Sequence, residues 1–235
     1  MARKKLKIAV TGGIGAGKSE VCRLISESGY KVINADDIAK DILKSDIAVR
    51  KKVIDLFGEE SYLGEEINRD YLSQNIFNDP DNVSKINSII HPLTLLKINN
   101  LISEELVKND IVFVESALIF EAHREDNYDY IFLVVAEEER RIKRILAKGI
   151  LSLSQITSRM DNQLSDEIKS DRADFIIYNN DGLNKLNALL ISYRLNKNKI
   201  FYVGLHYPKV QKGCILGSST IVHLNNYIPR SILNI

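Results

Sequence analysis

The residues best suited to chemistry lie near the amino terminus, where the segment from Thr11 to Ser19 reads TGGIGAGKS. Gly12, Gly17, Lys18 and Ser19 have the spacing of a phosphate-binding P-loop, in which glycines let the backbone turn its N–H groups toward a phosphate. The Lys18 ammonium can reach the β- and γ-phosphates, and the Ser19 hydroxyl can bind Mg²⁺. The loop therefore predicts a nucleoside triphosphate site. The residues expected to contact ATP are Gly13, Ile14, Gly15, Ala16, Gly17, Lys18, Ser19 and Glu20.

A carboxylate follows the second strand-like run, at Asp36 in VINADDIA. The carboxyl ends of neighbouring parallel strands meet at one crevice, so Asp36 could orient an acceptor hydroxyl and take its proton. The alternative is structural, because Asp is also a favoured N-cap and a helix is expected to start at Asp37. The spacing leaves these two interpretations about equal.

Two further acids stand near the end of the third strand-like run, Glu115 and Glu121. Either could hold the water shell of magnesium or contact the acceptor. A strand-end or helix-start carboxylate with no role in chemistry is an equal alternative for each, because acids stabilise helix amino termini.

Arginines follow the fourth strand-like run, at Arg140, Arg141 and Arg144, and another lies further on at Arg159. At this spacing Arg140 or Arg141 shares a helix face with Arg144. Guanidinium groups suit the charge that develops on a transferring phosphoryl group. Most helical arginines are simply solvated, so this role depends on a kinase interpretation.

The elements that would position these residues alternate between strands and helices, which is typical of a parallel sheet covered on both faces. The expected strands are Leu6–Val10, Lys31–Ile33, Ile111–Glu115, Tyr130–Val135 and Phe175–Tyr178. The expected helices include Lys18–Ser28, Asp46–Phe57, Asp70–Phe77 and Pro80–Lys108, the last kinked or broken at Pro92.

Two insertions interrupt this alternation. Residues 46–108 are mostly helical and far exceed a normal crossover, so they predict a separate acceptor-substrate domain. Residues 149–172 are polar and predict a helical hairpin, a lid that would keep water from the γ-phosphoryl group. The kinase core would then comprise residues 1–45 and 109–195, leaving 196–235 as an unassigned extension.

Composition indicates a soluble globular protein, with 45% hydrophobic and 27% charged residues and a net charge of +1. No apolar run approaches the about 18 residues of a membrane span. The basic start leads straight into the P-loop, and Cys22 and Cys214 form no disulfide framework, so we expect a cytoplasmic protein without a signal peptide. Scattered basic residues after Asp181 favour a solvated extension. The expected partners are small molecules, with no nucleic acid and no membrane, and the expected state is a monomer or weak homo-oligomer.

Taken together, these segments resemble the dephospho-coenzyme A kinases from about Lys7 to Gly182. The P-loop alone is shared by many families, but the combination is specific. The matching segments are TGGIGAGKS, NADDIA around Asp36, Asn68-Arg69 with Leu72 and Ile76-Phe77, NSIIHP, ALIFE, and the series Arg159, Gln163, Lys169, Ala173-Asp174 and Asn179. Asn34, Ala117 and Lys148 to Ile150 depart from the family pattern.

The resemblance implies ATP- and Mg²⁺-dependent phosphorylation of the ribose 3′-hydroxyl of dephospho-coenzyme A, the final step of coenzyme A biosynthesis. It also implies a P-loop nucleotide-kinase fold of class α/β: a five-stranded parallel sheet flanked by helices, with an inserted helical substrate domain and a helical lid. The implied catalytic residues are Lys18, Asp36, Arg144 and Arg159. The implied substrate-binding residues are Asp36, Arg69, His91 and Glu121, with Ser19 as the metal ligand.

Two rival functions are compatible with a P-loop. One is a kinase for a different nucleotide or nucleoside. The other is a switch or regulatory ATPase that uses the helical insertion as an interaction surface. The sequence lacks the guanine-specificity element N-K-x-D, and the D-x-x-G-like DLFG at Asp55 to Gly58 falls inside the insertion instead of following a strand, which counts against the switch.

Overall fold

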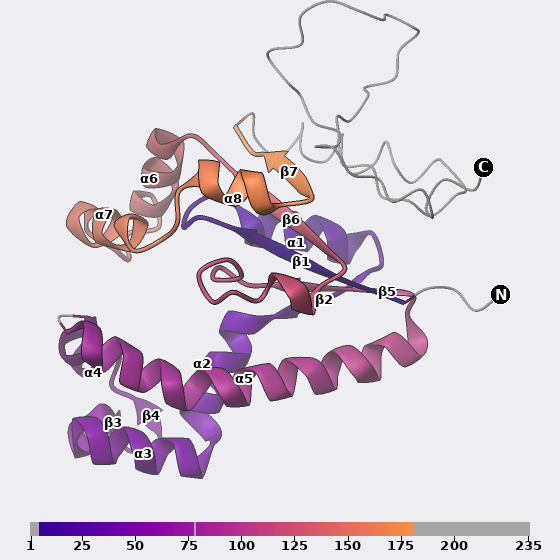
Figure 1. Cartoon of the computed structure of the whole chain (residues 1–235). Coiled ribbons are helices and arrows are strands. Elements are labelled where there is room, and N and C mark those ends of the chain that lie inside the picture. The colour runs from indigo at the N-terminus through magenta and orange to yellow at the C-terminus, as the bar shows by residue number, and fades with distance from the viewer. Residues whose placement is uncertain (1–4, 78, 181–235) are drawn as a thin grey trace, which may run out of the picture. The chain divides into compact units, whose positions relative to one another are not determined.

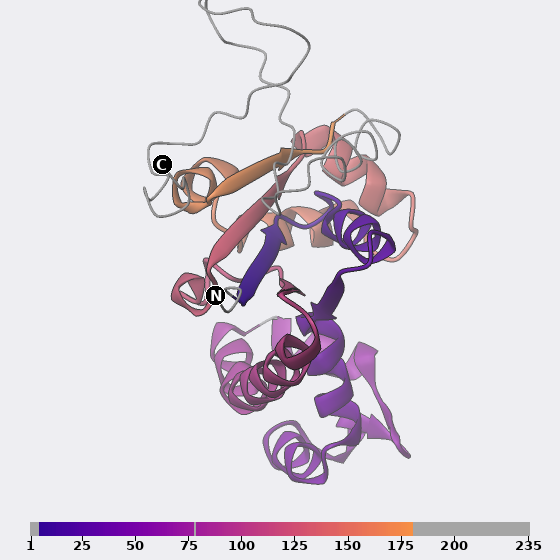
Figure 2. The same cartoon turned by 90° about the vertical axis from the view of Figure 1, so that its right-hand side faces the viewer.

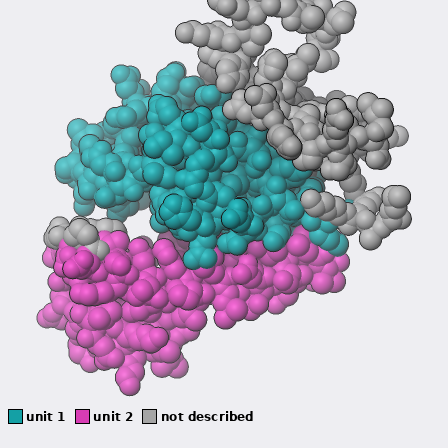
Figure 3. Space-filling view, viewed as in Figure 1, with its two compact units in different colours: residues 1–32, 110–235 teal, residues 33–109 magenta. Residues whose placement is uncertain are grey.

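The computed structural model describes residues 5–77 and 79–180. These residues belong to two compact units, one drawn from residues 1–32 and 110–235 and the other comprising residues 33–109 (Figure 3). The predicted extension 196–235 and Cys214 lie outside the described residues. Within the described ranges, no helix is long and apolar enough to cross a membrane.

The first unit is built on a five-stranded sheet in the order β2-β5-β1-β6-β7 (Figures 1 and 2). Its central strand β1 pairs in parallel with β5 on one side and β6 on the other, and β6 pairs in parallel with β7. The strands are β1 Leu6–Gly12, β2 Lys31–Asn34, β5 Ile111–Glu115, β6 Tyr130–Val135 and β7 Phe175–Tyr178. The predicted five-stranded α/β fold is therefore confirmed.

Alternate residues of the central strands enter two separate cores, one on each face of the sheet. Ile8 and Val10 pack with Phe132 and with the apolar side of α1 (Lys18–Glu27). Ala9 of the same strand packs on the other face with Phe120 and Leu133. Both faces are thus buried, which is why these strands read as nearly continuous apolar runs.

Three helices of the first unit lie between β6 and β7. They are α6 Glu138–Leu146, α7 Leu153–Asp161 and α8 Asp166–Arg172, and a short 3₁₀ turn, η2 Glu125–Asn127, precedes β6. Ser152 caps α7 and Ser165 caps α8 through their side chains. The expected helical hairpin over residues 149–172 is present as α7 and α8; its role as a lid remains a prediction.

The second unit is mostly helical, as expected for the insertion. It contains α2 Ala35–Ser45, α3 Ile47–Phe57, η1 Glu59–Ser61, β3 Tyr62–Leu63, β4 Glu66–Ile67, α4 Arg69–Phe77 and α5 Pro80–Lys108. Val49, Val53 and Phe57 of α3 form its core with Leu72 of α4 and Ile86 of α5. The structure groups α2 with this unit, and the domain boundaries expected at 45/46 and 108/109 remain a prediction about functional domains.

Of the two outcomes expected at Pro92, the break is wrong, because α5 runs through this residue without interruption, and the kink remains a prediction. Proline removes one backbone donor from the interior of this 29-residue helix. Ile86, Ile98 and Ile102 are buried on either side of Pro92. The packing of these side chains outweighs the loss of a single hydrogen bond.

Candidate active site

The P-loop connects the end of β1 at Gly12 to the start of α1 at Lys18. Gly17, the N-cap of α1, has a φ of 98°, and a Cβ atom there would lie 2.1 Å from the side-chain nitrogen of Asn179. Only glycine fits this position. Within the described residues α1 has no side-chain cap, so its amino-terminal N–H groups are suited to an anion such as a phosphate.

The Lys18 side chain folds back over the loop that precedes it. Its Nζ donates to the carbonyl oxygens of Gly12 at 2.9 Å and Gly13 at 3.2 Å. These bonds keep the ammonium at the mouth of the loop. A polyphosphate bound to the loop amides would meet this positive charge.

Ser19 and Glu115 meet at the carboxyl ends of β1 and β5, whose pairing places Val10 opposite Glu115. The Ser19 Oγ donates to Glu115 Oε1 at 2.9 Å, and Glu115 is buried. Of the two acids considered at this strand end, Glu115 is therefore the one beside the predicted metal ligand. Burial, together with the negative charge of Glu115, raises the pKa of the neighbouring Cys22 thiol.

Arginines of α6 hold the P-loop from its outer side. Arg141 is buried, and its Nε donates to the Ile14 carbonyl at 2.8 Å. Arg144 Nη1 lies 3.4 Å from the Ala16 carbonyl, and its Nη2 donates to the Asn179 carbonyl at 2.7 Å. Arg140 is exposed and pairs with Glu137 at 2.7 Å. Thus Arg141, and not Arg140, shares the loop-facing side of the helix with Arg144.

A second side chain reaches the same part of the loop from the junction between α7 and α8. Gln163 Oε1 accepts a hydrogen bond from the Ile14 backbone N–H at 2.8 Å. Asp166, at the start of α8, lies 3.2 Å from Arg141 Nη1. Burial raises the pKa of Asp166, and the positive charge of Arg141 opposes that rise.

Glu121 lies within the turn that follows β5 and contacts α8 and the junction between α7 and α8. Its Oε1 is 2.7 Å from Lys169 Nζ and accepts a hydrogen bond from Leu164 N at 3.2 Å. Lys169 is completely buried. The structure thus gives Glu121 an anchoring role, and the substrate-binding role implied by the resemblance remains a prediction.

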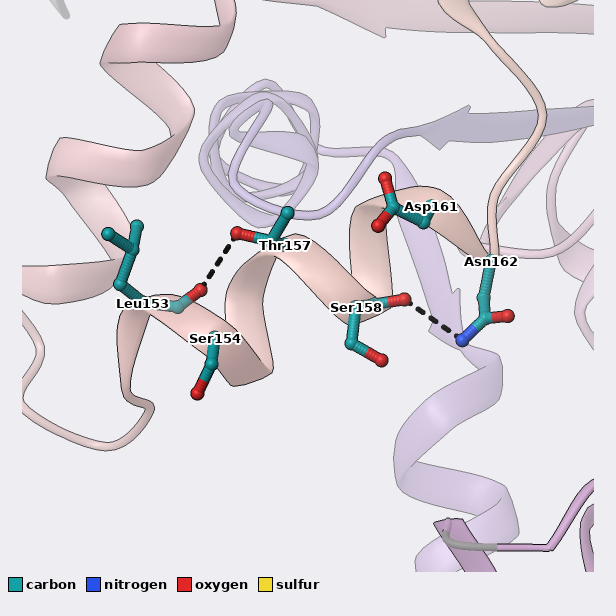
Figure 4. A pocket seen from close by; sticks show the side chains of 6 residues that line it. All are labelled: Leu153, Ser154, Thr157, Ser158, Asp161 and Asn162. Carbon is teal, nitrogen blue, oxygen red and sulfur yellow. Dashed lines mark hydrogen bonds between the residues drawn. The ribbon is translucent and has the colours of Figure 1, made fainter.

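Arg159 lies on the exposed surface of α7. A hollow of about 770 Å³ runs along this helix, lined by Leu153, Ser154, Thr157, Ser158, Asp161 and Asn162 (Figure 4). Two of the lining side chains already bind the helix backbone: Thr157 Oγ1 donates to Leu153 O, and Asn162 Nδ2 donates to Ser158 O. No P-loop residue lines this hollow, so the loop geometry, and not the hollow, defines the candidate site.

Three predicted residues belong to the second unit: Asp36, Arg69 and His91. Asp36 is exposed in the first turn of α2. The helix is capped by Asn34, whose Oδ1 accepts from the Asp37 N–H at 3.0 Å, so the alternative role of Asp36 as cap is wrong. Arg69 is exposed at the start of α4, and His91 is half-buried within α5.

The structure adds side chains that were not among the predicted site residues. Arg141 and Glu115 were only alternatives, and Gln163 and Asn179 carried no role. Asn179 is buried, and its Nδ2 donates to the Ala16 carbonyl at 2.9 Å. The sequence pattern that indicated Arg141 was its i, i+3 spacing from Arg144. Contacts across more than a hundred residues leave no local pattern.

Comparisons with known proteins agree with this geometry. Residues 6–185 match the dephospho-CoA kinase family. A dephospho-CoA kinase from Bacteroides fragilis is 35% identical over 202 residues, which cover 86% of this chain and 96% of the relative. One from Salinibacter ruber is 34% identical over 182 residues, which cover 76% of this chain and 91% of the relative. The solved dephospho-CoA kinase from Campylobacter jejuni has a TM-score of 0.59 and 29% identity, covering 77% of this chain and 92% of its own.

Proposed function

The chain belongs to the dephospho-CoA kinase family and is a kinase that phosphorylates dephospho-coenzyme A with ATP, and we propose that the P-loop residues described above hold the ATP and that Asp36 acts as the base for the acceptor hydroxyl. The observation that carries this proposal is the loop itself. Lys18 and the uncapped start of α1 concentrate positive potential at one point, and Ser19 adds a hydroxyl beside it.

The phosphoryl donor side consists of the loop and the arginines of α6. Residues 13–20 would contact the α- and β-phosphates, with the Ile14 N–H remaining on Gln163 Oε1, and Lys18 would shift from the Gly12 and Gly13 carbonyls toward the β- and γ-phosphates. Arg144 and Arg159 would neutralise charge on the phosphates or flank the adenine. Guanidinium groups suit this task because they donate several hydrogen bonds in one plane.

Mg²⁺ fits the donor set at Ser19. Groups of three or more His, Cys, Asp or Glu residues that could hold a metal ion do not occur among the described residues. Mg²⁺ with a nucleotide needs only one or two protein oxygens, because phosphates and waters complete its shell. Ser19 Oγ would be the direct ligand, and Glu115 would hold a water of that shell. When bound, the ion neutralises charge on the transferred phosphoryl group.

The acceptor side draws on the second unit. We assign Asp36 as the base that orients the ribose 3′-hydroxyl and takes its proton, with Arg69 and His91 contacting the acceptor and Glu121 completing its site. This assignment is supported by the fact that Asp36 does not cap the helix: Asn34 is the cap, and the Asp36 carboxylate is exposed. We further propose a cytoplasmic enzyme that acts as a monomer or weak homo-oligomer, without nucleic-acid or membrane partners.

The direct test mixes the purified chain with ATP, MgCl₂ and dephospho-coenzyme A and follows coenzyme A and ADP by mass spectrometry. Parallel reactions with nucleoside monophosphates measure specificity, and omission of the metal measures its requirement. Preferred transfer to a nucleoside monophosphate would contradict the assignment. ADP formed equally without any acceptor would indicate an ATPase instead.

The base assignment is tested by Asp36→Asn. Loss of a general base should lower kcat by roughly 10²–10⁴, while ATP binding measured by calorimetry stays unchanged. Asp37→Asn is the matched control, because Asp37 lies one residue further along the same helix turn and pairs with Lys40 at 2.9 Å. Near-normal turnover of Asp36→Asn would remove it from the mechanism.

A further inference from the structure

Ile14, in the middle of the P-loop, is held through both its backbone N–H and its backbone carbonyl, which belong to two successive peptide units. Its N–H donates to Gln163 Oε1 at 2.8 Å, and its carbonyl accepts from Arg141 Nε at 2.8 Å. The two side chains come from different elements, the α7–α8 junction and α6. Neither of the two peptide units that flank Ile14 can rotate without breaking its hydrogen bond.

The two clamping side chains are themselves anchored. Arg141 is buried, and its Nη1 lies 3.2 Å from Asp166 Oδ2 at the start of α8. Gln163 precedes Leu164, whose N–H donates to Glu121 Oε1 at 3.2 Å, so the backbone beside Gln163 is fixed to the turn after β5. The clamp is therefore part of a connected network and not a chance surface contact.

The close packing at the loop agrees with such a clamp. A Cβ atom added at Gly13, the residue before Ile14, would lie 2.3 Å from Arg141 Nη2. Arg141 thus occupies the space that any other residue at position 13 would need. Gly13 lets the guanidinium approach the loop backbone closely enough to reach the Ile14 carbonyl.

We propose that Gln163 and Arg141 are positioning residues that clamp the two peptide units flanking Ile14 and thereby hold the P-loop in its phosphate-binding shape before ATP arrives. The loop amides that bind phosphate must point inward together, and their aligned dipoles repel one another until an anion is bound. Fixing the two peptide units beside Ile14 lowers the ordering cost that ATP would otherwise meet on binding. This inference rests on the proposed binding of ATP at the loop, but not on the identity of the acceptor.

The first test is structural and needs no substrate. The Ile14 amide should be protected from hydrogen exchange in the wild-type chain, as measured by NMR on the protein alone. Gln163→Met has a side chain of similar length without the carbonyl acceptor, and it should speed exchange at Ile14 by several-fold. Unprotected exchange in the wild type, or an unchanged rate in Gln163→Met, would overturn the clamp.

The second test is functional and separates the two substrates. Loss of one hydrogen bond should weaken ATP binding by about two- to tenfold in Gln163→Met, with the KM for dephospho-coenzyme A unchanged. Equal loss for both substrates, or no loss for ATP, would contradict the proposal. If the chain instead phosphorylated another acceptor, the calorimetric ATP affinity would still report on the clamp, so the two proposals can fail separately.

Gln163→Glu supplies the conservative comparison. It keeps an acceptor oxygen for the Ile14 N–H but adds a negative charge near the polyphosphate. Its ATP affinity relative to wild type should therefore recover as the pH falls and the carboxylate becomes protonated, while Gln163→Met shows no such recovery. The matched control is Asn162→Ala, because Asn162 precedes Gln163 and its Nδ2 donates to the Ser158 carbonyl of α7. ATP affinity in this control should stay within about twofold of wild type, and a loss equal to that of Gln163→Met would overturn the proposal.

Discussion

Replacement of Lys169 by methionine probes the anchor that holds the base of α8. Lys169 is completely buried, and its Nζ lies 2.7 Å from Glu121 Oε1. Within the described residues, Lys169 Nζ and Glu121 Oε2 are buried without a hydrogen-bond partner of good geometry. Each charge therefore depends mainly on the other. Methionine fills nearly the same volume as lysine but leaves the Glu121 carboxylate without its counter-charge.

Removing one member of a buried ion pair lowers the free energy of unfolding by about 3–5 kcal/mol, because the remaining charge stays buried and unpaired. For a chain of this size each kcal/mol shifts the Tm by roughly 2–4 °C, so Lys169→Met should melt about 10 °C below wild type. Thermal unfolding followed by circular dichroism measures this shift. Lys143→Met, at an exposed position of α6, is the control and should change stability by less than about 0.5 kcal/mol.

The double variant Lys169→Met with Glu121→Gln decides whether the loss comes from the unpaired charge. It removes both charges and should regain most of the lost stability, since buried pairs replaced together are often nearly neutral. A Lys169→Met variant as stable as wild type would refute the reasoning, because it would mean that the Glu121 carboxylate needs no partner. A double variant no better than the single one would refute it as well.

Two further predictions concern ATP binding at the P-loop and the loss of folding stability at alkaline pH. Gly17→Ala should lower ATP affinity at least tenfold by calorimetry, because its Cβ would collide with the Asn179 side chain. Gly29→Ala is the control, because Gly29 also has a positive φ, 88°, but has open space where the Cβ would lie. This variant should lose only the roughly 1–2 kcal/mol of backbone strain and should keep its ATP affinity. Burial raises the pKa of Tyr128 to about 12. Its neutral form is therefore favoured in the folded state, and stability should be fully present below pH 10 and fall by roughly 2 kcal/mol as the pH rises toward 12. Tyr128→Phe should reduce this decline in urea unfolding at pH 8 and pH 11; an identical decline in both proteins would contradict the assignment.

The sheet could be predicted from the sequence because its central strands, which are buried on both faces, are nearly continuous apolar runs. Each of the five expected strands is present, and β1 and β2 extend slightly beyond the expected ends. The small β3–β4 pair was not predicted, since two residues per strand carry no periodic signal. The cap of α2 was not predicted: Asp36 was considered as the cap of a helix starting at Asp37, but the helix starts at Ala35 and Asn34 is its cap.

The site was predictable where its residues follow one another and not where they meet through the fold. Lys18 and Ser19 lie in a contiguous motif whose spacing reflects one ligand. Gln163 binds the Ile14 N–H across 149 residues, and no local pattern links the two positions. Arg141 and Arg140 are neighbours on α6, and they differ only in the direction in which their side chains leave the helix. That direction depends on how the helix packs, which residue spacing alone leaves open.

The burial of Cys22 has a consequence for a catalyst whose product is itself a thiol. Cys22 lies one turn after Ser19 in α1 and is the free cysteine of the described residues. Disulfide exchange requires a thiolate and access to it. Because burial and Glu115 raise its pKa, Cys22 stays protonated and enclosed at neutral pH. The disulfide form of coenzyme A should therefore not react with Cys22 in the helix that follows the P-loop. Turnover should be insensitive to this form of the product.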